Sequence, residues 1–188
     1  MSKVVAVFGG SRVEKHTPEY EQAYQMGKLL AGAGYVIVNG GYAGTMEASA
    51  RGAKENGGRA IGVISGEFGW LAPNAYLDEM VRQRDLFDRI RDMQSRSDAF
   101  IVLKGSMGTL AELALVWNLS KIDEMHRKPI ILVGDAWDRV LKSWRADLSV
   151  TDDEAKLLQI VKTPNDAMEI LKRKFDGRGD PFPISPSS

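Results

Sequence analysis

Residues 98–113 read "DAFIVLKGSMGTLAEL", which is an apolar run, a glycine-containing turn and the start of a helical pattern. The run Ala99–Leu103 is apolar throughout, which is typical of a parallel strand that is covered on both faces. The continuation "AELALVWNLSKI" predicts a helix over Thr109–Lys121. A strand followed by a turn and a helix is the repeating unit of α/β domains.

The same unit recurs along the whole chain. Strands are expected at Val4–Phe8, Tyr35–Asn39, Ala60–Ile64, Ala99–Leu103 and Pro129–Val133, with a short sixth near Leu157–Val161. Helices are expected at Glu19–Ala33, Thr45–Asn56, Arg84–Ser95, Thr109–Lys121, Ala136–Leu148 and Pro164–Lys174. This alternation predicts a single doubly wound, Rossmann-like α/β domain over residues 1–175, with a mostly parallel sheet flanked by helices.

Two segments break the alternation. Gly66–Glu79, "GEFGWLAPNAYLDE", is expected to be an ordered loop beside a site, because long loops in compact domains are often functional. The tail 176–188, "DGRGDPFPISPSS", lacks apolar periodicity and is expected to be irregular.

Composition excludes several classes of protein. The 188 residues fit one domain, and a net charge of zero provides no global field toward nucleic acid or an anionic membrane. The chain has no cysteine, which excludes disulfides, thiolate metal sites and cysteine nucleophiles. The start "MSKVVAVFGG" has no signal-peptide pattern, and no apolar run approaches the roughly 20 residues of a membrane helix. A soluble, cytoplasmic protein that binds neither nucleic acid nor membrane is expected.

Three of the predicted strand-to-helix turns are rich in glycine: "VFGGSR" from Val7, "VNGGYAGTMEA" from Val38 and "LKGSMGTLAEL" from Leu103. In a parallel sheet these turns share one edge, where open α/β folds bind ligands. Glycine lets the backbone approach a ligand, and the following helix N-terminus favours an anion. One such turn is explained by tight geometry alone, whereas three favour phosphate or nucleotide binding. Neither the dinucleotide spacing G-x-G-x-x-G nor the P-loop pattern occurs.

Two charged residues near these turns allow a structural and a functional interpretation. Thr109 and Glu112 fit a capping box, in which each side chain bonds the other's backbone N–H. Arg89 lies in "RQRDLFDRIRD", where Asp85 and Asp92 are helical neighbours and a surface ion pair is the simple explanation. The alternative in both cases is a role at the glycine-rich edge.

Read together, these residues resemble the Lonely Guy family of cytokinin-activating phosphoribohydrolases, often mislabelled lysine decarboxylases. The family hallmark P-G-G-x-G-T-x-x-E aligns with "KGSMGTLAE", with matches at Gly105, Gly108, Thr109 and Glu112 and departures at Lys104 and Ser106. The family arginine that precedes "SDAF" falls at Arg89, and Ile90 stands where the family has lysine. "FGGSR" resembles the family's F-C-G-S-S, and "NGGYAGTMEASARGA" resembles its Y-G-G-G-x-x-G-L-M-G-x-V-A-x-G-A. The resemblance covers about residues 3 to 175.

The resemblance implies hydrolysis of the N-glycosidic bond of a nucleoside 5′-monophosphate, such as a cytokinin nucleotide, to a free base and ribose 5-phosphate. It implies that Glu112 stabilises the positive charge at C1′ and activates water, and that Arg89 neutralises phosphate or the departing base. The implied phosphate- and nucleotide-binding residues are Gly9, Gly10, Ser11, Gly40, Gly41, Gly44, Gly105, Ser106, Gly108 and Thr109. Arg12, Glu47 and Lys104 are further candidates.

The family is commonly dimeric, so a homodimer or larger homo-oligomer is implied, with apolar surface from "LAELALVWNLSKI" and the helix before it as the contact. The alternative is that Leu113, Val116, Trp117 and Leu119 pack the core. No cofactor is expected. No metal is expected either, because the two histidines, His16 and His126, fall in different segments, and His126 is expected in a loop.

Two other functions remain open. Side branches of the superfamily include nucleotide-binding and molybdenum-cofactor carrier proteins, so a non-catalytic carrier that uses the same pocket is the main alternative. The departures at Lys104, Ser106 and Ile90 favour a carrier, whereas the presence of Glu112 and Arg89 favours the enzyme. An interaction protein that keeps only the fold is the third.

Overall fold

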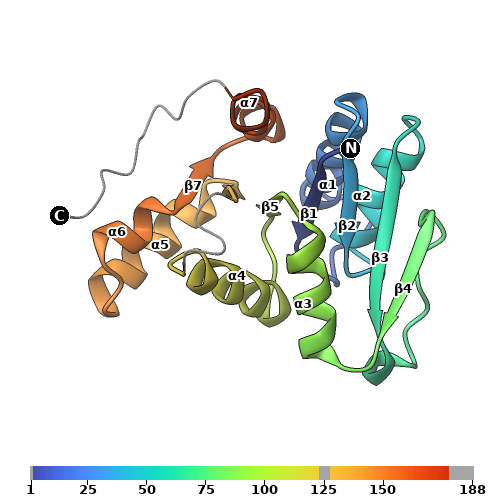
Figure 1. Ribbon diagram of the computed structural model, residues 1–188, viewed down its shortest axis with the longest axis horizontal. Coiled ribbons are helices and arrows are strands. Elements are labelled where there is room, and N and C mark those ends of the chain that lie inside the picture. Colours follow the sequence, from blue (N-terminus) through green and yellow to red (C-terminus); the bar gives the residue numbers. More distant parts are fainter. Residues whose placement is uncertain (1, 123–127, 178–188) are drawn as a thin grey trace.

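The computed structural model describes residues 2–122 and 128–177, and within them seven strands form one sheet (Figure 1). The strands are β1 (Val4–Phe8), β2 (Val36–Asn39), β3 (Arg59–Ser65), β4 (Glu79–Gln83), β5 (Ala99–Val102), β6 (Ile130–Val133) and β7 (Leu158–Val161). They lie in the order β4-β3-β2-β1-β5-β6-β7, and every neighbouring pair is parallel. The chain therefore reverses its direction of growth between β1 and β5, where open α/β folds form their ligand crevice.

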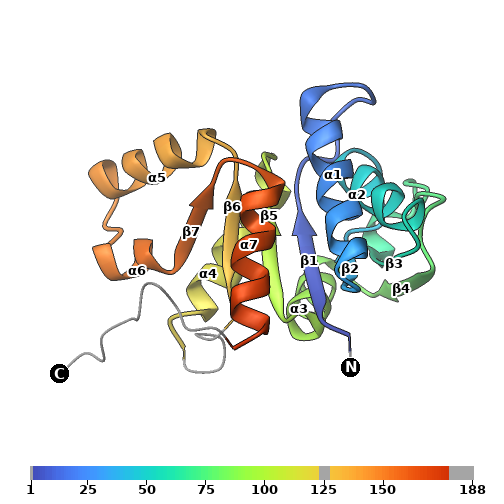
Figure 2. The same ribbon diagram turned by 90° about the horizontal axis from the view of Figure 1, so that it is seen from above.

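Helices cover both faces of this sheet (Figure 2). They are α1 (Pro18–Gly32), α2 (Thr45–Lys54), α3 (Leu86–Arg96), α4 (Met107–Leu119), α5 (Ala136–Asp147), the short α6 (Asp152–Lys156) and α7 (Pro164–Phe175). Helices α1, α2 and α7 pack on one face, and α3, α4 and α5 pack on the other. The prediction of a doubly wound, Rossmann-like domain is confirmed.

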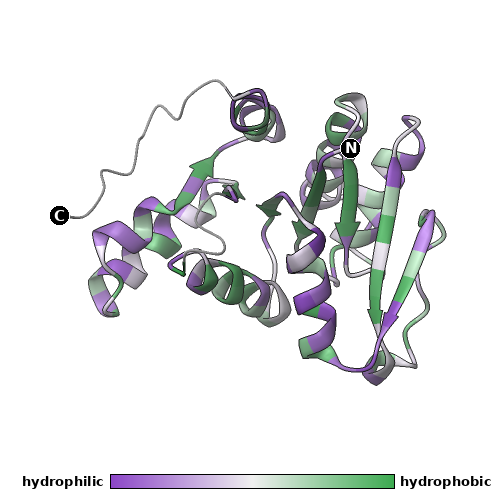
Figure 3. Cartoon of the chain, viewed as in Figure 1, coloured by the Kyte–Doolittle hydropathy of each residue, from purple (hydrophilic) through white to green (hydrophobic). Residues whose placement is uncertain are grey.

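Alternate residues of each central strand serve the two cores. In β5, Ala99 and Ile101 join the core under α1, α2 and α7, while Phe100 and Val102 join the core under α3, α4 and α5. All four are buried, so the strand has no polar face, and Figure 3 shows β1 and β5, in the middle of the sheet, as hydrophobic. Burial on both faces is the physical reason for the continuous apolar runs in the sequence.

The structure corrects the expected elements in several places, and the short helix α6 is one that was not expected. The edge strand β4 was not expected; its sequence "EMVRQ" alternates between half-buried and exposed positions. The expected loop Gly66–Glu79 contains a single 3-10 turn, η1 (Gly66–Phe68), and ends where β4 begins. Helix α4 begins at Met107, two residues before the expected start. His126 and all of the tail beyond residue 177 lie outside the described residues.

No helix within the described residues is both long enough and apolar enough to cross a bilayer.

Candidate active site

The three glycine-rich turns touch one another at the carboxyl ends of β1, β2 and β5. The Gly10 N–H donates to the Lys104 carbonyl at 3.2 Å, and the Thr45 N–H donates to the Gly10 carbonyl at 3.0 Å. A Cβ atom at Gly105 would overlap the Thr109 hydroxyl and lie 3.0 Å from the Gly10 nitrogen. Glycine is therefore required here partly because backbone packs directly on backbone.

The β2 turn is shaped by a buried asparagine. The Asn39 side chain donates to the Met46 carbonyl at 2.9 Å and accepts from the Gly41 N–H at 2.9 Å. Gly41 and Gly44 have φ of 78° and 68°, in the left-handed region that favours glycine. A Cβ at Gly44 would also overlap the Gly10 carbonyl oxygen. This turn is fixed both by its own dihedrals and by its contact with the β1 turn.

The N-termini of α2 and α4 lack the side-chain caps found on α1 and α3. Gly44 and Ser106 occupy the N-cap positions of α2 and α4 without a side-chain hydrogen bond. In α4 the N–H groups of residues 107–109 have no intrahelical acceptor, as in every helix start. Residues 104–108 are exposed, and a Cβ at Gly108 would meet nothing within 4 Å. The α4 N-terminus therefore offers free donors and the positive end of its dipole to an anion.

Arg89 is buried beside this edge. Its Nε donates to the Val63 carbonyl of β3 at 2.8 Å, and its Nη2 lies 3.9 Å from the Met46 sulfur. Its guanidinium lies 5.8 Å from the centre of the Tyr42 ring. A Cβ at Gly40 would overlap the Arg89 guanidinium. Gly40 is thus required by the arginine, and the β2 turn and β3 together fix its position.

The surface ion-pair interpretation of Arg89 is wrong. Asp85 is the N-cap of α3 and accepts from the Asp88 N–H at 2.8 Å. Asp92 pairs with Arg96 at 2.8 Å. Arg89 lies on the face of α3 that packs against the sheet, whereas Asp85 and Asp92 bond to other groups.

Glu112 is the acidic partner of Arg89. The distance from Glu112 Oε1 to Arg89 Nη1 is 3.5 Å, and the two side chains are only 10% and 7% exposed. Burial raises the pKa of Glu112 to about 7, and the positive charge of Arg89 opposes that rise. At neutral pH this carboxyl group exists in both protonation states, which suits a group that exchanges protons.

The capping-box interpretation of Glu112 is also wrong. Because α4 begins at Met107 with Ser106 as N-cap, Thr109 is already inside the helix. Glu112 lies in the second turn, whereas a capping box would place it in the first, and its side chain is turned inward to Arg89.

The remaining predicted residues are placed less centrally. Ser11 and Arg12 are exposed. Glu47 is bound to Lys15 at 2.9 Å and to the Tyr20 hydroxyl at 3.2 Å, so it ties α2 to the N-terminal part of α1. Lys104 pairs with Glu19 at 2.9 Å and keeps an exposed side chain.

Two residues that contact Arg89, Tyr42 and Met46, were not among the predicted site residues. Tyr42 stands inside the glycine turn "GGYAG", which is the signal that marks it. A bulky buried aromatic residue among glycines has no role in making a tight turn. The third contact, the Val63 carbonyl, is a backbone atom, and nothing in the residue types indicates it.

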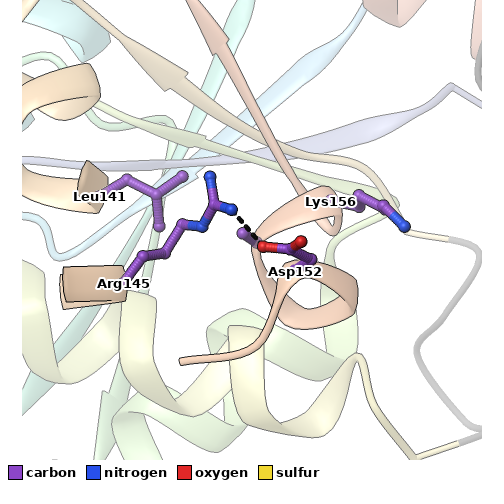
Figure 4. A pocket seen from close by; sticks show the side chains of 5 residues that line it. Leu141, Arg145, Asp152 and Lys156 are labelled. Atoms are coloured by element: carbon purple, nitrogen blue, oxygen red, sulfur yellow. Dashed lines mark hydrogen bonds and ion pairs between the residues drawn. The ribbon is translucent and has the colours of Figure 1, made fainter. Parts of the chain in front are cut away.

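Two surface hollows lie apart from the Arg89–Glu112 pair. One of about 350 Å³ lies between α5 and α6 and is lined by Leu141, Arg145, Asp152, Ala155 and Lys156, with an ion pair between Arg145 and Asp152 (Figure 4). The other, of about 190 Å³, is lined by Lys15, His16, Tyr20, Glu21, Tyr24 and Arg51. Within residues 2–122 and 128–177 no group of three or more His, Asp or Glu side chains is arranged to hold a metal ion.

The sheet and its site define a class: a Rossmann-like α/β protein with glycine turns joined at the topological switch point, beside a buried arginine–glutamate pair. The chain belongs to the SLOG cluster4 family, whose sequence profile it matches over residues 2–168. This membership confirms the resemblance to the Lonely Guy proteins.

Curated relatives and solved structures agree with this assignment. A cytokinin riboside 5′-monophosphate phosphoribohydrolase of Mycobacterium tuberculosis is 37% identical over 134 residues, which cover 69% of this chain and 70% of the relative. The protein of the same name from Mycobacterium marinum is 33% identical and covers 72% of this chain and 74% of its own length. A molybdenum cofactor binding protein from Rippkaea orientalis superposes with a TM-score of 0.74 at 25% identity, covering 93% of this chain and 98% of the other.

Proposed function

We propose that this protein hydrolyses the N-glycosidic bond of a nucleoside 5′-monophosphate and releases a free base and ribose 5-phosphate. The observation that carries the proposal is the buried Glu112–Arg89 pair beside an uncapped helix N-terminus at the switch point of the sheet. The names of the two mycobacterial relatives support this reaction and a cytokinin-type nucleotide as one substrate.

Glu112 is the catalytic carboxylate in this proposal. As the bond between C1′ and the base nitrogen breaks, the electron pair leaves with the nitrogen and positive charge grows at C1′. The ionised Glu112 stabilises that charge and accepts a proton from the water that adds to C1′. The proton that Glu112 takes from water is passed on to the departing nitrogen, so nucleotide and water become base and ribose 5-phosphate and Glu112 returns to its ionised form. A pKa of about 7 keeps a useful fraction of the carboxylate ionised at neutral pH.

Arg89 holds this carboxylate in place. One of its N–H groups is fixed by the Val63 carbonyl, which leaves the Nη1 side directed at Glu112. A buried guanidinium here keeps part of the Glu112 population ionised and offers positive charge to the departing base.

The 5′-phosphate is proposed to bind at the start of α4. Free N–H groups of residues 107–109, the Ser106 hydroxyl and the exposed turn 104–108 are the donors on that side. The turn at Gly9–Ser11 forms the adjoining wall because it touches the β5 turn directly, and the turn at Gly40–Gly44 continues that wall through its contact with Gly10. The exposed Lys104 adds a positive charge to the same turn.

A homodimer is proposed, with α4 at its interface. The alternative that α4 only packs the core holds for one face, because Leu113 and Val116 are buried and Trp117 and Leu119 pack beside them. The opposite face remains apolar and exposed at Met107, Ala111, Ala114 and Leu115, and Ile122, just beyond the end of the helix, is exposed as well. A second copy of this helix would cover that surface. A cytoplasmic location, without nucleic acid or membrane as partner, is part of the same proposal.

A second candidate function is a carrier that binds a nucleotide-like cofactor without turnover. The superposition with the molybdenum cofactor binding protein over nearly the whole of both chains favours it. The two candidates share the phosphate-binding edge and differ in what Glu112 does.

The test is base release from a panel of nucleotides. AMP, GMP, CMP, UMP and isopentenyl-AMP are incubated with the purified protein and the products are separated by chromatography. Free base that is lost in Glu112→Gln and Arg89→Ala, and kept in the exposed control Glu169→Gln on α7, supports the hydrolase. A nucleotide that raises the melting temperature without any base release supports the carrier.

A further inference from the structure

A series of aromatic rings leads from the buried arginine to the surface. The Arg89 guanidinium lies 5.8 Å from the Tyr42 ring centre, Tyr42 and Phe68 are 6.0 Å apart, and Phe68 and Trp70 are 5.9 Å apart. Both ring pairs meet edge to face, which is a favourable arrangement of aromatic quadrupoles. The last ring, Trp70, is 77% exposed. We call Tyr42, Phe68 and Trp70 the aromatic ladder.

The connection between β3 and β4, which carries Phe68 and Trp70, is hydrogen-bonded to the glycine-rich turn after β2. The Asn74 side chain donates to the Gly41 and Tyr42 carbonyls at 3.1 and 3.0 Å, and its N–H donates to Gly41 at 2.9 Å. The Tyr42 hydroxyl donates to the Ser65 carbonyl and accepts from the Ser65 N–H. These hydrogen bonds hold the segment that carries Phe68 and Trp70 against the turn after β2, so they fix the position of the ladder relative to that turn.

The start of the same connection, just after β3, is hydrogen-bonded to α3. The Glu67 carboxylate accepts from the Leu86 N–H, the first residue of α3, at 2.9 Å. Since α3 also carries Arg89, the ladder and the buried arginine are positioned by the same helix.

The order of the strands gives the ladder a direction relative to the phosphate site. Along the carboxyl edge the order is β3, β2, β1, β5. The α4 N-terminus follows β5, whereas Tyr42 follows β2 and the Phe68–Trp70 segment follows β3 (Figure 1). The Arg89–Glu112 pair lies between the ladder and the N-terminus of α4, because Arg89 donates a hydrogen bond to β3 and pairs with a carboxylate on α4. A nucleotide carries its phosphate and its base on opposite sides of the ribose, so phosphate at α4 and C1′ at Glu112 direct the base toward β3.

We propose that Trp70 is the base-binding residue of this site, and that it stacks on the heterocycle of the nucleotide. This inference rests on the proposed function for the position of the phosphate and of C1′. Stacking on an indole accepts any base, because every base has a π-face, and it is strongest for the larger purines and their apolar N6-substituted forms. It also gives the release of one product a physical basis: ribose 5-phosphate has no aromatic ring to stack on Trp70.

The experiment measures the binding of AMP and of ribose 5-phosphate to the 188-residue protein by calorimetry. Glu112→Gln is the background, so that the nucleotide is not consumed. Adding Trp70→Ala is expected to weaken AMP binding by about fivefold or more while the affinity for ribose 5-phosphate is unchanged, because stacking on an aromatic side chain contributes at least that much. Trp70→Phe is expected to restore most of the loss. Leu148→Ala, an exposed apolar control at the end of α5, is expected to change neither affinity.

A second readout is tryptophan fluorescence. Of the four tryptophans, Trp70, Trp117, Trp137 and Trp144, only Trp70 belongs to the ladder. AMP is expected to quench the fluorescence of the wild-type protein and to lose that effect in Trp70→Phe.

The outcomes separate this proposal from the proposed function. AMP binding that depends on Trp70 in a protein that releases no base would support the ladder and count against the hydrolase. Base release with the same KM in Trp70→Ala would leave the hydrolase intact and overturn the ladder. The ladder is also overturned if Trp70→Ala weakens AMP and ribose 5-phosphate equally, or if the wild-type protein binds no nucleotide.

Discussion

Replacing Glu112 with glutamine should stabilise the folded protein, and the gain should depend on pH. Glu112 is a buried carboxyl group whose pKa is raised from its ordinary 4.5 to about 7, first by burial and against the opposing charge of Arg89. Glutamine has nearly the same shape and no charge. The variant therefore removes the energetic cost of ionising a buried acid and keeps the packing.

The magnitude follows from the linkage between protonation and folding. In the unfolded chain the carboxyl group ionises near pH 4.5, whereas in the folded protein it stays protonated up to about pH 7. Between these values the folded state binds the proton more tightly, so the free energy of unfolding falls as pH rises. At about 1.4 kcal/mol for each pH unit, the full difference is roughly 3 kcal/mol above pH 7 and close to zero below pH 4.5. Arg89 faces a neutral partner in the variant, as it does in the wild-type protein at low pH.

The assay is denaturant unfolding of the wild-type protein and of Glu112→Gln at a series of pH values from 4 to 8. The difference between the two curves cancels the other titrating groups. The account predicts equal stability at the acid end and a variant that is more stable by roughly 3 kcal/mol at pH 8. A difference that does not change with pH would refute the reasoning, because it would mean that Glu112 titrates alike in the folded and unfolded chains.

Three further predictions follow from the same geometry. The pH profile of kcat/KM for base release should rise through an apparent pKa near 7, because the ionised form of Glu112 is the active one; a flat profile between pH 5 and 8 would exclude it as the titrating carboxylate. Lys104→Ala should raise KM for a nucleotide several-fold, and Glu19→Gln should lower it by freeing the lysine; both effects should shrink at high salt, and a KM indifferent to both changes would remove Lys104 from the phosphate site. Leu115→Asp on the exposed face of α4 should convert a dimer to a monomer in sedimentation velocity, with Leu148→Asp as an exposed control that leaves assembly unchanged; a wild-type monomer would contradict the proposed interface.

The sequence predicted the strands and turns that are set by local physics. Runs such as Val4–Phe8 and Ala99–Val102 are apolar because they are covered on both faces, and their signal needs no partner to be recognised. The glycine turns were likewise readable, because parallel strands bring all strand-to-helix turns to one edge. β4 was not readable in this way, since this edge strand alternates half-buried residues with the exposed Met80 and Arg82 and lacks the apolar run.

The arrangement of the site depends on contacts between distant segments, and there the sequence was ambiguous. The charge pattern around Arg89 is that of a surface helix, and only the Val63 carbonyl and Glu112 explain its burial. The start of α4 was placed too late because Ser106 takes the N-cap position without a side-chain hydrogen bond and Gly108 is tolerated in the first turn. That shift of two residues moves Glu112 from the role of a cap to a buried position opposite Arg89.

The most direct test of the central claim follows one nucleotide through the protein and its Glu112→Gln variant. Isopentenyl-AMP or AMP is incubated with each, and free base and ribose 5-phosphate are quantified together with nucleotide affinity. The account predicts equal amounts of the two products from the wild-type protein, and a variant that still binds the nucleotide but releases no base. Base release that survives in Glu112→Gln, or its absence from the wild-type protein with every nucleotide tested, would contradict it.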